Sequence, residues 1–219
     1  MAAGPAVTFV VVAGTGTDIG KTWVTAGLAT VLRGRAVAVV ARKPVQSFAP
    51  EHDAPTDAEV LGEATGEDPY VVCPAHRWLP RAMAPPMAAE ALGAEPFTFA
   101  DLALQIRQHA PRHGVVLVES VGGVRSPLAA DGDTVALVAA LAPALVVLVA
   151  DAELGTINVV RLSVDVLRSH RVVVFLNRYD QGRELHVRTH DWLVTREGLE
   201  VVTDVEALER LVAPLALTD

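Results

Sequence analysis

Two lysines are the first candidates for chemistry in this chain, because the other sixteen of its eighteen basic residues are arginines. Lysine carries a compact charge on a flexible stem and performs chemistry for which arginine is poorly suited. The two are Lys21 and Lys43, and each follows a short apolar run of the kind that forms a buried strand. We therefore expect ligand chemistry at two places in the chain.

Lys21 lies in a glycine-rich turn with the features of a phosphate-binding P-loop. The turn follows the apolar run 8–13, precedes a helix with periodic apolar residues, and reads Gly14-Thr15-Gly16-Thr17-Asp18-Ile19-Gly20-Lys21-Thr22. Backbone N–H groups of such a turn bind phosphate oxygens, the lysine binds the β- and γ-phosphates, and the threonine hydroxyl binds Mg²⁺. Thr15 stands where the standard spacing has glycine, with Gly14 one position earlier. An ordinary strand-to-helix turn is the alternative, and the Gly20-Lys21-Thr22 ending favours the P-loop.

Lys43 follows the apolar run 36–41, at the carboxyl end of the second predicted strand. In open α/β sheets that edge is where ligands bind. Pro44 restricts Lys43 to an extended conformation and so sets where its side chain leaves the backbone. A solvated surface lysine is the alternative, and the arginine bias of the chain makes a ligand contact the better interpretation.

Acidic residues occupy places from which they could bind the Mg²⁺ of a nucleotide, which needs hard oxygen ligands. Glu119 ends the apolar run 115–118 and precedes Gly122-Gly123, so we predict that it binds metal. Asp57 begins a predicted helix, where it is either a second ligand or a plain helix cap. Asp151 ends another apolar run, and its position alone does not show whether it also binds metal.

The elements that must position these residues alternate along the chain. Five apolar runs rich in β-branched residues predict strands at 8–13, 36–41, 115–118, 145–150 and 172–176. Helical patterns lie at 21–33, 56–65, 99–112, 134–141, 158–168, 183–194 and 205–212. This alternation predicts an α/β fold, a three-layer α/β/α sandwich with a mainly parallel sheet of the P-loop NTPase type. We expect one domain, 1–219, with an irregular proline-rich insert at about 47–93 that acts as a substrate loop.

Composition excludes several classes of function. The 219 residues carry a net charge of −8, which argues against a nucleic-acid partner. Cys73 is the single cysteine, so neither an intrachain disulfide nor a cysteine zinc cluster is available. The longest apolar stretch, 134–150, contains Pro143 and is shorter than the roughly 20 residues of a membrane span. We expect a cytoplasmic protein with neither a membrane nor a nucleic-acid partner.

Taken together, the motifs resemble those of the dethiobiotin synthetase family and occur in that family's order from about residue 8 to residue 178. They are the turn from Gly14 to Thr22, Lys43-Pro44-Val45-Gln46-Ser47, Thr56-Asp57-Ala58, Val118-Glu119-Ser120-Val121-Gly122-Gly123, Leu154-Gly155-Thr156-Ile157-Asn158 and Asn177-Arg178. The stretch 80–90 also resembles that family's substrate-side loop. The resemblance implies an ATP- and Mg²⁺-dependent ligase that closes a cyclic urea on 7,8-diaminononanoate with CO₂. The reaction would pass through a carbamate and its mixed anhydride with phosphate, and would serve biotin synthesis.

The resemblance also implies roles for individual residues. Lys43 and Lys21 would be catalytic, and Mg²⁺ would be held by Thr22, Asp57 and Glu119. The nucleotide would contact Thr17, Asp18, Ile19, Gly20, Lys21, Thr22, Trp23, Asp57, Glu119, Gly122, Asn177 and Arg178. The diamine or its carbamate would contact Thr17, Lys43 and Ser47. The family is a homodimer, so Gly155, Thr156, Ile157 and Asn158 would hold the substrate carboxylate from the neighbouring subunit.

Several features leave alternatives open. Ser120 and Val121 add side chains where the family usually has Gly-Ala, and this favours a non-catalytic, regulatory nucleotide-binding relative as one alternative. A partition-type P-loop ATPase is another, although such proteins usually carry an extra lysine early in the phosphate loop, and this chain has none there. The run Asn177-Arg178-Tyr179-Asp180 resembles both an adenine-reading asparagine and the guanine-reading Asn-Lys-x-Asp motif. We predict ATP, with GTP and CTP as alternatives.

Overall fold

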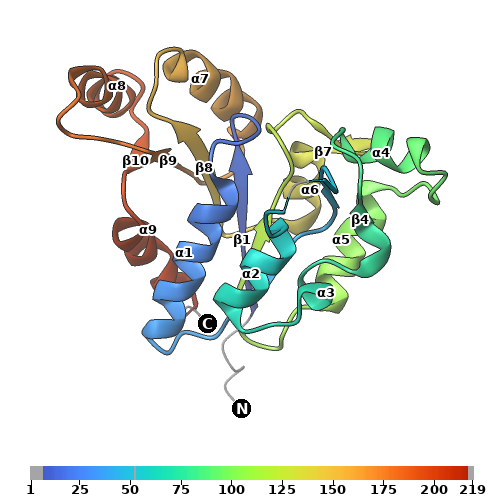
Figure 1. The fold of residues 1–219 in the computed structure, drawn as a ribbon. Helices are drawn as coiled ribbons and strands as arrows, with labels where there is room; N and C mark the ends of the chain where they lie inside the picture. The colour runs from blue at the N-terminus through green and yellow to red at the C-terminus, as the bar shows by residue number, and fades with distance from the viewer. Residues whose placement is uncertain (1–6, 52, 217–219) are drawn as a thin grey trace.

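A computed structural model describes residues 7–51 and 53–216, so the first six and last three residues of the expected domain lie outside the described part. Within it, six parallel strands form the central sheet in the order β10-β9-β8-β1-β5-β2 (Figure 1). The strands are β1 (Val7–Gly14), β2 (Val39–Arg42), β5 (Gly114–Glu119), β8 (Leu145–Asp151), β9 (Val172–Asn177) and β10 (Glu200–Val202). The predicted α/β fold with a mainly parallel sheet is confirmed.

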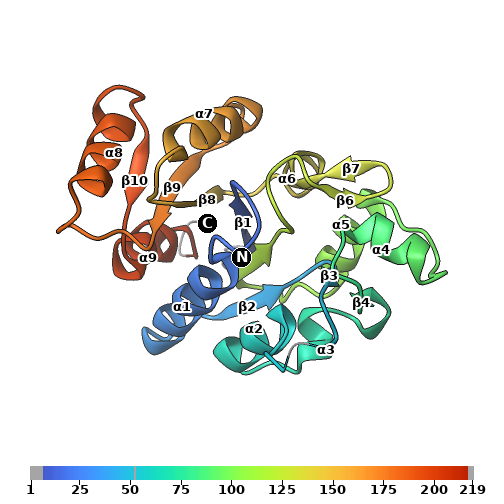
Figure 2. The same cartoon turned by 45° about the horizontal axis from the view of Figure 1, so that its top comes forward.

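Helices cover both faces of this sheet, as the alternation of side chains along β1 requires. Val10 and Val12 of β1 pack in a cluster with α1 (Lys21–Gly34) and α9 (Val205–Val212). Phe9 and Val11 point to the opposite face. The helices on that face are α5 (Phe99–Gln108), α6 (Thr134–Leu141), α7 (Thr156–Leu167) and α8 (Glu184–Thr195). Figure 2 shows the two helical layers on either side of the sheet.

The insert between β2 and α5 contains more regular structure than its prolines suggest. Pro69 and Pro85 stand at helix starts, where a missing N–H costs nothing because no intrahelical acceptor exists for it. The elements of the insert are β3 (Gln46–Ser47), α2 (Asp57–Thr65), α3 (Pro69–Val72), η1 (Ala75–Arg77), β4 (Trp78–Leu79) and α4 (Pro85–Ala91). Outside it lie a short hairpin, β6 (Pro127–Ala129) with β7 (Gly132–Asp133), and η2 (Ala213–Ala216).

Some boundaries differ from the predicted ones for local reasons. The second strand begins at Val39 rather than residue 36, because Ala36 adopts a left-handed conformation (φ 58°) in the turn that ends α1. Helix α5 ends at Gln108, shortly before Pro111, which has no N–H to continue it. Strand β10 is an addition, because three edge residues are too few for a pattern to show.

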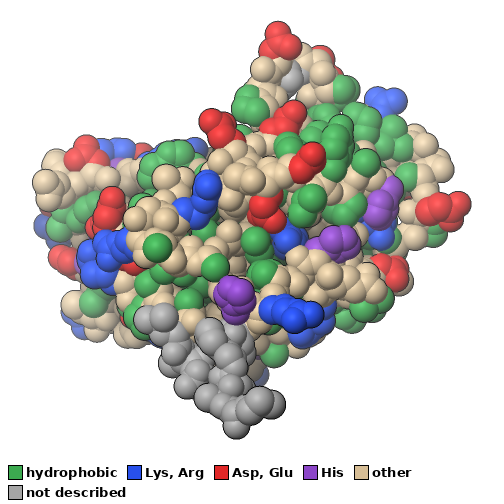
Figure 3. All heavy atoms as spheres, turned by 90° about the horizontal axis from the view of Figure 1, so that it is seen from below, with side chains coloured by type: hydrophobic (Ala, Val, Ile, Leu, Met, Phe, Trp, Pro, Cys, Tyr) green, Lys and Arg blue, Asp and Glu red, His purple; other side chains and the backbone are tan. Residues whose placement is uncertain are grey.

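The carboxyl ends of the strands meet at one edge, towards the top of Figure 1, where the loop between β1 and α1 lies. Strand β1 lies between β5 and β8, so this loop borders both, and Val12 of β1 pairs in register with Glu119. The opposite end of the molecule, seen in Figure 3, intersperses acidic, basic and apolar side chains. Among the described residues no helix is long and apolar enough to cross a membrane.

Candidate active site

The glycine-rich turn forms a compact loop between β1 and α1. Gly20, immediately before α1, has φ 90°, and Asp18 also adopts a left-handed conformation. A Cβ on Gly14 would lie 2.8 Å from Ile19 Cδ1 and 2.9 Å from Lys21 Cδ. It would also lie 3.1 Å from the Gly122 carbonyl oxygen, so glycine at position 14 avoids crowding within the loop. The Thr15 N–H donates to the Val149 carbonyl of β8 at 3.0 Å.

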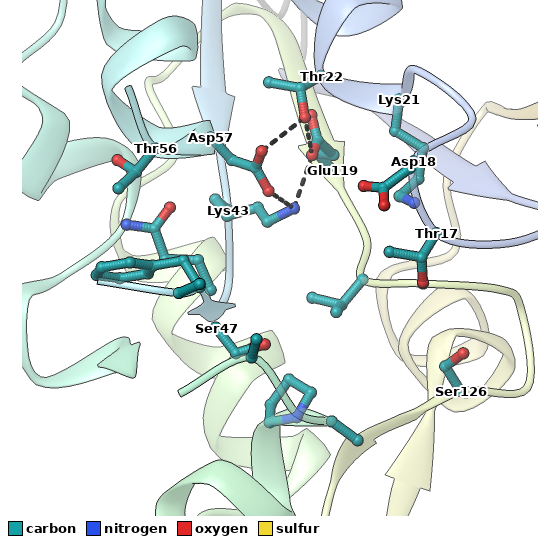
Figure 4. A pocket seen from close by; sticks show the side chains of 18 of the residues that line it. Thr17, Asp18, Lys21, Thr22, Lys43, Ser47, Thr56, Asp57, Glu119 and Ser126 are labelled. Atoms are coloured by element: carbon teal, nitrogen blue, oxygen red, sulfur yellow. Dashed lines mark hydrogen bonds and ion pairs between the residues drawn. The ribbon is translucent and has the colours of Figure 1, made fainter. Parts of the chain in front are cut away.

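The buried Lys43 side chain lies at the centre of a cluster of charged groups, in which Glu119 is buried and Asp57 is 42% exposed (Figure 4). Its Nζ is 2.6 Å from Asp57 Oδ2 and 2.7 Å from Glu119 Oε1. Each member comes from a different element: Lys43 follows β2, Asp57 begins α2 and Glu119 ends β5. A capping box between Thr56 and Glu59 fixes the start of α2, and so positions Asp57.

Thr22 joins the same two carboxylates from the side of the phosphate loop. Its Oγ1 lies within hydrogen-bond distance of both, 2.8 Å from Asp57 Oδ1 and 2.9 Å from Glu119 Oε1, and the two carboxylates share its single hydroxyl proton. The second oxygen of Glu119, Oε2, is buried and has no hydrogen-bond partner among the described residues. Three hard oxygen donors, one with unused capacity, suit Mg²⁺, which keeps waters and phosphate oxygens as its other ligands. The described residues hold no group of three His, Cys, Asp or Glu side chains for a closed metal cage.

The two lysines experience opposite electrostatic environments. Burial by itself lowers the pKa of Lys43, but the Asp57 and Glu119 carboxylates outweigh it and hold that pKa above its usual value. For Lys21, burial is the largest effect and the nearby Lys43 charge adds to it, and together they lower its pKa to about 8. Lys43 therefore stays charged at neutral pH, whereas Lys21 loses its proton at a pH only slightly above neutral. Its Nζ donates to the Gly16 carbonyl of the loop at 2.8 Å.

A cavity of about 790 Å³ extends from the phosphate loop past Lys43 to the insert. It is lined by ten of the predicted site residues: Thr17, Asp18, Gly20, Lys21, Thr22, Lys43, Ser47, Asp57, Glu119 and Gly122. Met83 of the wall lies in the stretch 80–90, which resembles the family's substrate-side loop, whereas sequence reasoning missed Gln46, Phe48, Val121 and Ser126 as wall residues. Gln46 and Val121 belong to the motifs at 43–47 and 118–123, so their place in those motifs could have identified them as site residues. The others come from insert and loop segments with no periodic pattern.

Other predicted site residues lie outside the cavity wall. Ile19 packs partly buried under the loop, and Trp23 is exposed on α1. Asn177 ends β9 and Arg178 follows it. Both contact the phosphate loop: Asn177 Nδ2 donates to the Ile19 carbonyl and Arg178 Nη2 to the Asp18 carbonyl, each at 2.8 Å. A direct contact of either residue with a nucleotide base stays a prediction.

The segment from Gly155 to Asn158 also lies away from the cavity of its own chain. It begins α7, where Gly155 has φ 99° and the Thr156 hydroxyl donates to the Asp151 carbonyl. The Thr156 N–H donates to the Glu153 carbonyl at 3.2 Å and the Asn158 N–H to the Gly155 carbonyl at 3.1 Å, and the positive end of the helix dipole suits a carboxylate. Within one chain, the cluster around Lys43 and this helix start are separate features.

Comparisons with known proteins identify the family. A family model described as an AAA domain matches residues 8–214. A protein of Anaeromyxobacter sp. (strain Fw109-5) named ATP-dependent dethiobiotin synthetase is 36% identical over 204 residues, which cover 91% of this chain and 87% of that protein. A protein of the same name from Caulobacter sp. (strain K31) is 39% identical over 166 residues, 74% of this chain and 71% of the relative.

Solved structures share the fold at low sequence identity. Chloroplast FtsY from Physcomitrella patens superposes with a TM-score of 0.54 at 17% identity, covering 95% of this chain and 65% of FtsY. A plasmid partition protein from Borrelia burgdorferi gives a TM-score of 0.51 at 8% identity, covering 97% of each chain. These structural likenesses show the P-loop fold alone, whereas the sequence relatives identify the family. The chain belongs to the dethiobiotin synthetase family of ATP-dependent ligases.

Proposed function

We propose that this protein closes a cyclic urea on 7,8-diaminononanoate with CO₂ and ATP, giving dethiobiotin. The observation that carries the proposal is the Lys43 ammonium, buried between two carboxylates beside a cavity that begins at the phosphate loop. That position lets one cation contact both a substrate anion and the γ-phosphate. The apolar side chains of Phe48, Met83 and Val121 on the cavity wall suit the methylene chain of the diamine.

In the first step, one substrate amine attacks CO₂, loses a proton and becomes a carbamate. The charged Lys43 stabilises this anion electrostatically, because its pKa stays high despite burial. Thr17 and Ser47 line the same cavity and would bind the diamine or its carbamate. The Ser47 hydroxyl already donates to the Met83 carbonyl at 2.7 Å, which ties the insert to this wall.

In the second step, a carbamate oxygen attacks the γ-phosphorus of ATP, the bond to the bridging oxygen breaks and ADP leaves. Phosphoryl transfer depends mainly on positioning and charge stabilisation. Lys21 and the loop N–H groups would bind the β- and γ-phosphates. The second amine then attacks the carbonyl carbon of the mixed anhydride and loses a proton, and phosphate leaves as the ring closes.

Thr22, Asp57 and Glu119 would hold Mg²⁺ in this scheme. The ion supplies charge neutralisation on the phosphates when it is bound. The unpartnered Glu119 Oε2 and the two oxygens within hydrogen-bond distance of Thr22 support this assignment.

The proposal is tested by phosphate release with ATP, Mg²⁺, bicarbonate and 7,8-diaminononanoate, leaving out one component at a time. We expect release only when all four are present, with dethiobiotin formed in equal amount by mass spectrometry. GTP and CTP in place of ATP test the base preference, and faster release with GTP would contradict the choice of ATP. Nucleotide binding without diamine-dependent release would favour the regulatory alternative.

Lys21 makes ATP binding dependent on pH. Its pKa of about 8 in the folded protein lies below the usual lysine pKa of 10.5. The unfolded chain therefore binds more protons between these values, and the free energy of unfolding rises with pH there. Bound phosphates favour the charged form, so ATP binding at pH 8 is expected to take up protons. Calorimetry in two buffers of different ionisation enthalpy measures this uptake. Lys21→Arg, which keeps the charge without titrating, is the control, and equal uptake in that variant would contradict the assignment.

We further propose that the enzyme is a homodimer in which Gly155, Thr156, Ile157 and Asn158 complete the substrate site of the other subunit. Around this helix start, Leu154 is 86% exposed and Leu162 is 61% exposed, with Val159 between them. An apolar helix face beside an anion-binding helix start suits contact with a second copy, because burial of these side chains stabilises the pair.

Leu162→Asp is expected to convert the protein to a monomer in light scattering and to raise the KM for the diamine, while ATP affinity is unchanged. The cause is a charge placed in an apolar interface. Leu104→Asp on α5, where the leucine is similarly exposed at 56%, is the matched control and should leave the dimer intact. A monomeric parent protein with full activity would contradict the shared site.

A further inference from the structure

The carboxylate that ends β8 has no part in the proposed reaction, yet the structure gives it a definite partner. Asp151 Oδ2 is 2.5 Å from Nη1 of Arg178, the residue that follows β9. The other guanidinium nitrogen, Nη2, donates to the Asp18 carbonyl of the phosphate loop at 2.8 Å. One guanidinium therefore connects the end of β8 with the loop that follows β1.

The neighbouring residue acts on the same loop. Asn177 Nδ2 donates to the Ile19 carbonyl, so two consecutive side chains bind two consecutive loop carbonyls. A Cβ on Gly20 would lie 2.1 Å from that Asn177 nitrogen, which shows how closely the amide is seated against the loop. Both Arg178 and Asp18 have φ 57°, a left-handed conformation that is uncommon for non-glycine residues, and more so for arginine than for aspartate.

These contacts determine which way the loop N–H groups point. In a planar trans peptide the carbonyl and the following N–H point in opposite directions. Holding the Asp18 carbonyl towards Arg178 turns the Ile19 N–H away from it, and holding the Ile19 carbonyl towards Asn177 does the same for the Gly20 N–H. Among the described residues, none accepts a hydrogen bond from either N–H. Successive N–H groups of this kind form an anion-binding concavity.

We infer that Asp151 and Arg178 are positioning residues of the phosphate loop, which hold the Asp18–Ile19 peptide so that its N–H faces the triphosphate of the nucleotide. The inference rests on the proposed use of ATP at this loop. It differs from a role for Arg178 in reading the base, because an effect transmitted through the loop acts on any triphosphate. Asp151 contributes only through Arg178, by fixing the direction of the guanidinium.

The test compares Arg178→Gln, Asp151→Asn and the double variant with the parent protein, without diamine. Dissociation constants are measured for ATP, GTP, CTP and inorganic triphosphate in Mg²⁺, together with thermal midpoints. We expect Arg178→Gln to weaken every ligand about tenfold, the effect of one charge-assisted hydrogen bond. Asp151→Asn should weaken them in the same direction, and the double variant should match Arg178→Gln alone because the two residues act as one unit.

Arg171→Gln is the matched control, because Arg171 flanks the other end of β9 and pairs with Glu200 at 3.3 Å. It should leave all four dissociation constants unchanged, and Arg178→Lys should recover part of the loss. A loss confined to one base, additive effects of the two substitutions, or an equal loss in Arg171→Gln would overturn the inference. Unchanged triphosphate binding in Arg178→Gln would overturn this inference and leave the proposed function intact. A parent protein that binds no triphosphate would overturn both.

Discussion

Lys43→Ala is expected to reduce turnover about a thousandfold, the upper range for loss of one preorganised electrostatic group. ATP affinity should stay close to that of the parent protein, because Lys43 lies outside the phosphate loop and contacts Asp57, Glu119 and the Ser120 carbonyl. Pre-steady-state phosphate release and equilibrium ATP binding measure the two quantities separately. The physical reason is that the carbamate and the transferred phosphoryl group lose the Lys43 cation that stabilises both.

The same substitution leaves Glu119 buried without its counter-charge, and breaking a buried pair costs roughly 3–5 kcal/mol. A lower thermal midpoint is therefore expected in the absence of Mg²⁺, with partial recovery on adding Mg²⁺ and ATP. Lys43→Arg keeps a positive charge with a different shape and tests whether charge alone is sufficient. An ATP affinity that falls as far in Lys43→Ala as in Lys21→Ala would show that the two lysines do not have separate roles.

Lys21→Ala is expected to weaken ATP binding about a hundredfold and to lower turnover with it. A lysine that contacts two phosphates contributes charge-assisted hydrogen bonds, and about 2.7 kcal/mol corresponds to a hundredfold change in the dissociation constant. Isothermal titration with ATP and Mg²⁺ measures the loss.

Folding should not suffer, because burial disfavours the charged form of Lys21 and lowers its pKa to about 8. Removing it takes away a buried charge, so the thermal midpoint should be unchanged or higher. Arg35→Ala, on the far end of the same helix and paired with Glu209 at 2.9 Å, is the control and should bind ATP normally. Undiminished ATP affinity in Lys21→Ala would show that Lys21 and its loop do not bind the nucleotide.

Much of the fold followed from local patterns. Apolar β-branched runs predicted five of the six sheet strands, since strands buried on both faces have no polar side. Helix α6 matched its predicted bounds, Thr134–Leu141, because Asp133 caps one end. Helix α2 of the insert was predicted at 56–65, but the short edge strand β10 and the insert helices α3 and α4 were missed. Three residues carry no period, and Pro85 in the first turn of α4 suggests a loop unless its place at a helix start is known.

The sequence predicted which residues form the candidate site, but not how they are arranged around one another. Residue types and strand ends selected Lys43, Asp57 and Glu119 separately. Asp151 and Glu119 look alike in the sequence, since each is an acid at the end of an apolar run. Strand order separates them: Glu119 faces Thr22 and Lys43, whereas Asp151 faces Arg178 across the β8–β9 side. Strand order depends on how similar apolar runs pack against one another, which no single run encodes.

The sequence by itself determined the class of chemistry. A phosphate loop, a second lysine and strand-end acids each require only a residue type at a local position, because nearby backbone geometry decides what such a residue offers. Only the tertiary structure decided that Lys43 lies between Asp57 and Glu119, and that Asn177 and Arg178 bind the phosphate loop instead of lining the cavity. Thr22 and Glu119, for example, are 97 positions apart in the chain and 2.9 Å apart in space. Such contacts depend on strand order and on side-chain direction across the sheet edge, which arise when the whole core packs.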